Sequence, residues 1–390
     1  MKIGIAALIA AYMLSQFYRA FLAVLTPVLK ADLGATAQDL SAASGLWFLT
    51  FTLMQIPIGW SLDRVGPRWT ASILLLAGGA GGAMVFASAT TPFDLKLAMA
   101  LIGIGCAPVL MASYFIFARC FSPALFGTLA GALIAVGSLG NIAGSVPLAA
   151  AAASFGWRES VTALAVFTAL VACAVAGLVR DPPRVAGAIE GSLLDLLRMP
   201  ALWLILPMMA ANYAPIAALR GLWVGPYYTD VFGADAAGIG RVTLIMGLAM
   251  VAGNIGYGVM DRIFGTRKWV VLIGNLCASA CLLGLWALPT LGGWQTIALL
   301  AGVGLFGASF PMVLAHGRAF VPPHLMGRGV TLLNLFGIGF IGIAQIITGR
   351  LHAGLPKIPP ETPYSAIFLF FALMLIAGIA IYAFSTDRTD

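Results

Sequence analysis

Long apolar runs separated by short polar segments dominate the chain. A helix that crosses a bilayer needs about 20 mostly apolar residues, and each of these runs is long enough. We predict twelve membrane-spanning helices, at residues 4–28, 40–61, 69–89, 96–118, 126–152, 160–179, 201–227, 240–260, 269–289, 294–315, 328–349 and 364–384. The pattern therefore predicts an all-α integral membrane protein.

Composition and charge agree with this class. The 390 residues are 61% hydrophobic and 9% charged, whereas soluble chains carry about 25% charged residues. The net charge of +7 does not indicate a nucleic-acid partner, because basic residues of membrane proteins collect in cytoplasmic loops. Placing the N-terminus inside puts thirteen Lys and Arg in cytoplasmic segments and six outside. We expect a monomer in the lipid bilayer of a cell inner membrane, with both termini cytoplasmic.

The polar residues do not form the patterns that enzymes need. The five cysteines lack paired metal-ligand spacing, and no cluster of His, Cys or carboxylates lies near a predicted membrane face. No loop has the glycine pattern that cradles phosphates. The sequence therefore indicates secondary transport, without a cofactor or a metal.

An internal repeat divides the chain. The loop after the second helix reads "GWSLDRVGPRW" (59–69), and the loop after the eighth reads "GYGVMDRIFGTRKW" (256–269). Asp63 and Asp261 are 198 residues apart. Such duplication is typical of transporters with a site near the bilayer midplane. We predict six-helix halves at 1–180 and 200–390, joined by a cytoplasmic linker at 181–199.

These features resemble the major facilitator superfamily over the whole chain. The resemblance implies two pseudo-symmetric six-helix bundles that work by alternating access. It also implies that the loop motif latches cytoplasmic helix ends through Gly59, Asp63, Arg64, Gly66 and Arg68, with Asp261, Arg262, Gly265 and Arg267 as weaker counterparts. Pro67 departs from the motif, which leaves the local hydrogen bonding open.

Arg19 lies inside the first apolar run, where a charge costs about 2.5 to 3.5 kcal/mol. The outer interface is on the order of 14 Å away, beyond comfortable reach of the guanidinium. All fourteen acidic residues fall in loops, at helix ends or in tails. The sequence therefore offers Arg19 no carboxylate in the membrane core.

The second half repeats this arrangement. Tyr12 and Arg19 are seven residues apart, as are Tyr213 and Arg220, and the two pairs are offset by 201 residues. Seven residues make about two helical turns, so each tyrosine shares a face with its arginine. Two guanidinium forks can grip an oxyanion bidentately, which predicts an anion site between the halves and resembles the anion-handling branches of the superfamily. Interhelical hydrogen bonding to carbonyls and amides is the alternative.

Further polar residues are candidates for the same pocket. Gln16 is one turn from Arg19, and Trp223 and Tyr227 follow Arg220 at helical spacing. The intramembrane amides Asn141, Asn212, Asn334 and Gln345, together with Tyr114, would contact a ligand or pin helices. The glycine-rich segment 137–144 is predicted to be a close-packing surface.

The sequence favours a secondary active transporter of a small organic or inorganic anion, with a carboxylate preferred. Two positive charges in an empty site would repel, whereas a bound anion would favour an occluded state, so anion exchange is one expected mode. Export of drug-like apolar molecules is the main alternative. A soft-metal importer, suggested by the methionine pair Met246 and Met250 at four-residue spacing, is the less favoured one.

Overall fold

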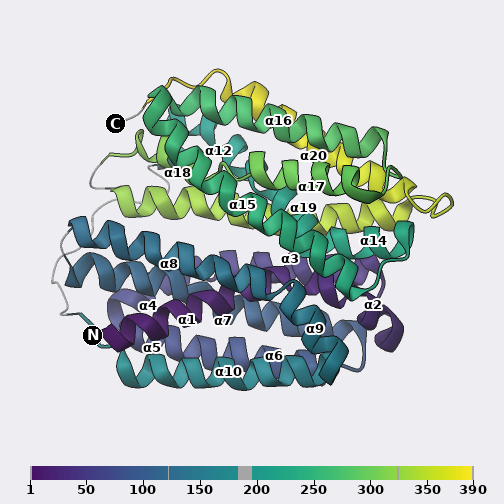
Figure 1. Ribbon diagram of the computed structural model, residues 1–390. Coiled ribbons are helices and arrows are strands. Elements are labelled where there is room, and N and C mark those ends of the chain that lie inside the picture. The colour runs from purple at the N-terminus through teal and green to yellow at the C-terminus, as the bar shows by residue number, and fades with distance from the viewer. Residues whose placement is uncertain (1, 122, 183–195, 323–324, 389–390) are drawn as a thin grey trace. The chain divides into compact units, whose positions relative to one another are not determined.

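The computed structural model describes residues 2–121, 123–182, 196–322 and 325–388, and the regular elements in these ranges are helices (Figure 1). Eleven of them are long and apolar enough to cross a membrane. A twelfth span is formed if the pair Gly131–Ala143 and Val146–Phe155, bent by 41°, counts as one. The predicted all-α membrane fold is confirmed, and the bent pair occupies the predicted segment 126–152.

The chain folds into two compact units. Unit 1 contains Met1–Ala186 and Asp235–Arg241, and unit 2 contains Gly187–Ala234 and Val242–Asp390. Most of the predicted linker, residues 183–195, lies outside the described residues.

The helices of unit 1 are α1 (Lys2–Ala20), α2 (Leu22–Leu33), α3 (Ala37–Leu53), α4 (Gln55–Arg64), α5 (Pro67–Leu74), the π-helical turn η1 (Leu75–Ala80), α6 (Gly81–Ala87), α7 (Pro92–Cys120), α8 (Pro123–Ala143), α9 (Val146–Phe155) and α10 (Trp157–Leu178). Within the unit, α3 packs along α7, and α1 packs on α8, α7 and α10.

The helices of unit 2 are α12 (Pro200–Asn212), α13 (Ala214–Ala218), the π-helical turn η2 (Leu219–Trp223), α14 (Val224–Phe232), α15 (Ala236–Phe264, whose first turns belong to unit 1), α16 (Arg267–Ala287), α17 (Gly293–Phe306), α18 (Phe310–Arg318), α19 (Met326–Gly354) and α20 (Thr362–Tyr382). In this unit α16 packs on α20 and α17, and α12 packs on α20 and α19.

Acidic residues at helix starts serve as caps. Thr36 and Asp39 form a capping box at α3, and Thr91 and Asp94 form one at α7. Each carboxylate accepts a backbone N–H that the first helical turn leaves unpaired. Lys96 also pairs with Asp39 at 2.7 Å. These acids therefore complete helix ends and do not compensate a charge in the membrane.

The glycines of α8 bring its backbone against α1. A Cβ at Gly140 would lie 1.9 Å from the Met13 carbonyl oxygen, and one at Gly144 would lie 3.3 Å from the Phe17 oxygen. Only a residue without a side chain fits the first of these contacts. The predicted close-packing surface at 137–144 is confirmed.

Six of the predicted continuous helices are divided, namely 4–28, 40–61, 69–89, 126–152, 201–227 and 294–315, and the first and fifth carry the two arginines. The segment 4–28 breaks at Phe21, between α1 and α2, and 201–227 is divided into four elements. Pro215 lacks the N–H that would bond to the Ala211 carbonyl, which accounts for the break between α12 and α13. Phe21 and the turn η2 stand at equivalent places in the repeat, since they are separated by the same offset as Arg19 and Arg220.

Candidate functional site

Arg19 is held by two aromatic rings of α3. Its Cζ atom lies 5.2 Å from the centroid of the Trp47 ring and 4.9 Å from that of Phe51. The two rings stack with centroids 5.1 Å apart and planes 16° apart. A guanidinium over such rings is attracted by their π-electrons, and the attraction grows when water is excluded. The aromatic faces thus offset part of the cost of placing this charge in the membrane.

The hydrogen-bonding capacity of Arg19 is unused. Among the described residues it forms no hydrogen bond and no ion pair, and its Nε atom is shielded from solvent without an acceptor. Arg19 stands in the last turn of α1, but α2 continues the helical run beyond Phe21. The other described charged residues of unit 1 lie in loops or within two turns of the end of such a run. The structure therefore leaves Arg19 as a partly exposed cation, with a shielded Nε, whose N–H groups can donate to a ligand.

The platform beneath Arg19 is rigid. Thr50 Oγ1 donates to the Ala100 carbonyl at 2.9 Å, and Gln55 Nε2 donates to the Ala107 carbonyl at 3.3 Å. A Cβ at Gly103 would lie 2.4 Å from the Trp47 carbonyl oxygen, so α7 touches the backbone of α3 directly. The contacts of Thr50 and Gly103 hold α3, which carries both rings, against α7, and Gln55 holds the start of α4 there.

Tyr12 and Gln16 continue the Arg19 face of α1. Gln16 Nε2 donates to Tyr12 Oη at 2.7 Å, whereas Gln16 Oε1 is buried without a donor. Spacings of four and three residues place the three side chains on one face of the helix. The ring of Tyr12 lies against Gly137, where a Cβ would come within 2.3 Å. Unit 1 therefore presents an aromatic tyrosine, an amide oxygen and a guanidinium in a row.

Arg220 is bound more tightly than Arg19. It lies in η2, is 4% exposed, and donates from Nε to the Thr243 carbonyl of α15 at 3.1 Å. A π-turn inserts one extra residue into a helix, and such turns are frequent at functional sites. The alternative of hydrogen bonding to a carbonyl, left open by the sequence, therefore applies to Arg220 at least in part.

The predicted aromatic neighbours of Arg220 are packed into unit 2. Trp223 donates to Thr348 Oγ1 at 3.0 Å, and Tyr227 donates to the Pro289 carbonyl. Both side chains are 1% exposed, and their rings contact Tyr364. Their polar groups already have partners, which indicates a packing role.

The intramembrane amides differ in whether their polar groups already have hydrogen-bond partners. Asn212 donates to the Met208 carbonyl of its own helix, and Gln345 donates to the Ala218 carbonyl just before η2. Asn141 is buried and has a partner. Asn334, in contrast, is partly exposed and makes no hydrogen bond within the described part of the chain. Asn212 Oδ1 is buried without a partner among the described residues, and Asn334 also has polar atoms available for a ligand.

Tyr213 and Tyr114 are neither fully packed in the core nor fully exposed. Tyr213 ends α12 and is partly exposed, with its ring 5.3 Å from that of Phe310. Tyr114 on α7 is also partly exposed and interacts with Tyr12.

The loop motif of unit 1 closes onto the end of α10. Asp181 accepts the backbone N–H of Arg68 at 2.8 Å, and the Arg68 side chain donates to the Ala176 carbonyl at 2.5 Å. Gly66 has φ 105°, and a Cβ there would lie 2.7 Å from the Asp181 carboxylate. Asp63 pairs with Arg119 of α7 at 3.5 Å. Pro67 occupies the first position of α5, where the missing N–H has no cost.

Unit 2 repeats this capping. Asp387 accepts the Thr266 hydroxyl at 2.5 Å and the backbone N–H groups of Arg267 and Lys268 at 3.2 and 3.0 Å. Burial alone would raise the pKa of Asp387, but these hydrogen bonds outweigh it and hold the pKa below its usual value. Asp261 pairs with Arg267 at 3.5 Å.

The other predicted latch residues have fewer partners. Gly59 faces open space, and Arg64 lies over the Trp60 ring at 5.0 Å. Gly265 has φ 57°, as the turn before α16 requires, and Arg262 is exposed.

Asp181 and Asp387 cap the helices that follow the two loop motifs, and neither was predicted to do so from the sequence. The signal was available, since each is the first acid after the last helix of its half and stands beside an arginine, Arg180 or Arg388.

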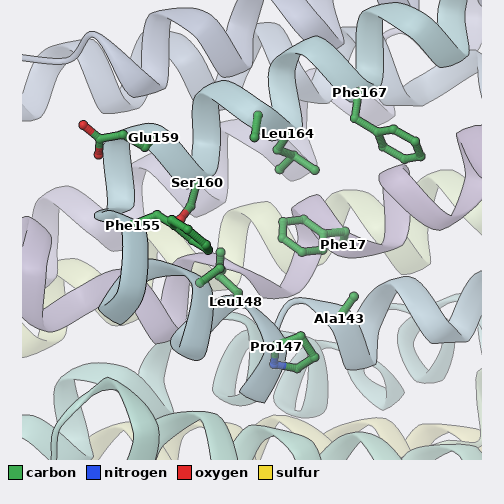
Figure 2. A pocket seen from close by; sticks show the side chains of 11 residues that line it. Phe17, Ala143, Pro147, Leu148, Phe155, Glu159, Ser160, Leu164 and Phe167 are labelled. Atoms are coloured by element: carbon green, nitrogen blue, oxygen red, sulfur yellow. The ribbon is translucent and has the colours of Figure 1, made fainter.

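Two apolar hollows lie away from the arginines. One, of about 650 Å³, lies between α1, α8, α9 and α10, and Figure 2 shows Phe17 facing it and the Glu159 carboxylate pointing away at one end. The other, of about 370 Å³, is lined by α15, α16 and α17, including Tyr257 and Trp269. Neither hollow is lined by Arg19 or Arg220.

Comparisons with known proteins agree on one family. The family model described as Major Facilitator Superfamily matches residues 8–344. A D-xylose-proton symporter has a similar structure with TM-score 0.80 and 14% identity, covering 99% of this chain and 98% of that one. A bacterial homologue of the human lysosomal transporter Spinster, in an inward-facing and occupied conformation, gives 0.76 and 17%, with 98% and 96% covered.

The nucleoside transporter NupG gives a TM-score of 0.76 and 15% identity, with 98% of this chain and 99% of that one covered. A comparison with curated proteins gave no match. The structural matches share the fold, and the family match covers most of the sequence. The chain therefore belongs to the Major Facilitator Superfamily, whose members are membrane transporters that work by alternating access and are not enzymes.

Proposed function

We propose that this transporter moves a small anion, with a carboxylate preferred, and that Arg19 binds the charged group. The observation that carries the proposal is the unused hydrogen-bonding capacity of Arg19 in a membrane-spanning helix. An unpaired charge is expensive in that environment. A bound anion supplies the missing charge and the missing acceptors at once.

Arg220 adds a second positive charge at the equivalent place in the repeat. Its Nε is engaged with Thr243, so we assign it a secondary role in anion binding. A bound anion would compensate the positive charge of the site, and we propose exchange of one anion for another as the transport mode.

The site that we propose contains fewer residues than the sequence analysis named. We keep Arg19, Arg220, Tyr12, Gln16 and Asn334, because each offers charge or polar atoms. Tyr213 and Asn141 stay candidates, while Trp223 and Tyr227 are assigned to packing. We further propose that the protein is a monomer in a cell inner membrane with both termini in the cytoplasm.

The structural neighbours do not indicate the substrate. They are described as a D-xylose-proton symporter, a nucleoside transporter and a homologue of Spinster. At 14 to 17% identity these likenesses extend only to the fold. The proposal therefore depends on the chemistry of Arg19.

Thermal unfolding of the purified protein with a panel of anions tests the proposal. A ligand that binds only the folded state stabilises it by about 2.7 kcal/mol at about 100 times its dissociation constant. We expect at least one anion class to raise the unfolding temperature of the wild type but not of Arg19→Ala. Arg350→Ala is the matched control, because Arg350 is exposed near the end of α19 and should leave the shift intact. Stabilisation by apolar or cationic compounds alone would overturn the proposal and favour the drug-exporter alternative.

A further inference from the structure

We propose that the substrate is a monocarboxylate that also carries a hydroxyl group, and that Trp47 and Gln16 select it. This inference rests on the proposed function, since it assumes that Arg19 binds an anion. It adds two residues with distinct roles. Trp47 shares the carboxylate with Arg19, and Gln16 receives the hydroxyl group.

The donors near Arg19 fit a carboxylate. Arg19 Nε and Trp47 Nε1 are both shielded from solvent, and neither has an acceptor in the described part of the chain. Trp47 is fully buried, and its ring lies 5.2 Å from Arg19 Cζ. Buried N–H groups without an acceptor are rare in folded proteins and call for a partner. The two oxygens of a carboxylate can accept from the guanidinium and from the indole together.

The charge balance favours a single negative charge. Arg19 is the one cation in the middle of a described helical run of unit 1, counting α1 and α2 together. Arg220 already donates to a carbonyl. The two cation–π partners of Arg19, Trp47 and Phe51, are apolar rings that offer no hydrogen-bond donor from their faces to a second negative charge. A monocarboxylate with an apolar body matches this environment better than a phosphate ester.

Gln16 defines the second group of the substrate. Its Nε2 is engaged with Tyr12 Oη, which leaves Oε1 as a buried acceptor without a donor. Gln16 and Arg19 are three residues apart on α1, so their Cβ atoms are about 5 to 6 Å apart. A small substrate that carries a carboxylate at one end and a hydroxyl group at the other can therefore bind Arg19 with the carboxylate and donate from the hydroxyl group to Gln16 Oε1.

Three probes of similar shape distinguish the possibilities. We would measure the affinity of the full-length protein for 4-hydroxybenzoate, benzoate and phenyl phosphate by calorimetry and by thermal shift. We expect 4-hydroxybenzoate to bind about five- to tenfold more tightly than benzoate, the gain of one buried hydrogen bond. Phenyl phosphate should bind more weakly than either.

Variants assign the two roles. Gln16→Leu should remove the difference between 4-hydroxybenzoate and benzoate. Trp47→Phe keeps a ring beside Arg19 but loses the N–H, and should weaken both carboxylates by the same factor of about five to tenfold. Trp60→Phe, at a half-exposed tryptophan of α4, should change neither affinity.

The outcomes separate this inference from the proposed function. Equal affinity of the wild type for 4-hydroxybenzoate and benzoate overturns the hydroxyl assignment, even if a variant fails to fold. Tighter binding of phenyl phosphate than of both carboxylates, lost in Arg19→Ala, overturns the monocarboxylate assignment while anion transport stands. Failure of every anion to bind the wild type overturns both.

Discussion

Gly247 of α15 lies where a methyl group would fall 2.9 Å from Nη2 and 3.1 Å from Nε of Arg220. The guanidinium therefore occupies the space that a side chain at residue 247 would fill. This contact holds Arg220 in the geometry that lets Nε reach the Thr243 carbonyl, four residues earlier on the same helix.

Replacing Gly247 with alanine should displace Arg220. We expect Gly247→Ala to reduce substrate affinity at least tenfold and to lower the free energy of unfolding by about 1 to 3 kcal/mol, the usual range for overpacking. Ligand-dependent thermal shifts measure the first effect, and denaturation without ligand measures the second.

Gly258→Ala is the matched control, because Gly258 lies on the same helix and its Cβ position is open. It should leave affinity unchanged. Equal losses in both variants would show that α15 tolerates no alanine, and would remove the link to Arg220.

The two arginines should respond in opposite ways to truncation without ligand. Arg19→Ala removes a partly exposed charge that lies in a membrane span and lacks hydrogen bonds, so the unfolding temperature should stay the same or rise. Arg220→Ala leaves the Thr243 carbonyl without this donor and opens a cavity, which should destabilise the protein by about 1 to 3 kcal/mol. Thermal unfolding of both variants in detergent makes the comparison. A clear loss of stability in Arg19→Ala would indicate a structural role for that residue.

Gly66 should not tolerate a side chain. It combines φ 105° with a contact to the Asp181 carboxylate, so alanine there would be strained and would also push the cap away from α5. We expect Gly66→Ala to destabilise the protein by about 1 to 3 kcal/mol. Gly59→Ala, in the same motif, faces open space and should be neutral or slightly stabilising. Chemical denaturation of the pair tests this difference.

Asp387 should make stability depend on acid pH. Its carboxylate is favoured in the folded state, so its pKa lies below the unfolded value of about 3.9. The stabilisation is complete above that value and is lost as pH falls through the lower, folded pKa. At neutral pH, Asp387→Asn should therefore cost about 1 kcal/mol, as for the loss of a helix cap.

The difference in unfolding temperature between Asp387→Asn and the wild type should shrink as pH falls below about 4. Glu361→Gln, which removes a carboxylate that accepts no hydrogen bond from the described side chains, should show no such trend. A constant difference between Asp387→Asn and the wild type from pH 7 to pH 3 would contradict the capping role.

The helices and their number follow from the length of the apolar runs, because a bilayer imposes one length on every span. The internal repeat could also be predicted from the sequence. The two "DR" loops, and the pairs Tyr12–Arg19 and Tyr213–Arg220, are recognised from their spacing alone. The sequence correctly placed the capping acids at helix ends, but it did not predict which groups they bind. Asp181 and Asp387 reach helices more than a hundred residues earlier, and sequence spacing gives no distance between such segments.

Trp223 and Tyr227 show where counting along a helix fails. Their spacing from Arg220 assumed a regular α-helix, but η2 adds one residue to the turn. An extra residue rotates the following side chains by about 100°. Both aromatic residues consequently belong to the core of unit 2, a consequence of backbone geometry that composition does not reveal. Trp47 and Phe51 were missed for a different reason, since aromatic residues four apart are common wherever helices pack.

The contact between Gly140 and Met13 has a mechanical consequence. No side chain separates the two backbones, so a slide of α1 along α8 by one residue, about 1.5 Å, would drive carbonyl oxygens into Cα atoms. We therefore expect α1 and α8 to move together. Tyr12, Gln16 and Arg19 all lie on α1 and would move with that pair of helices.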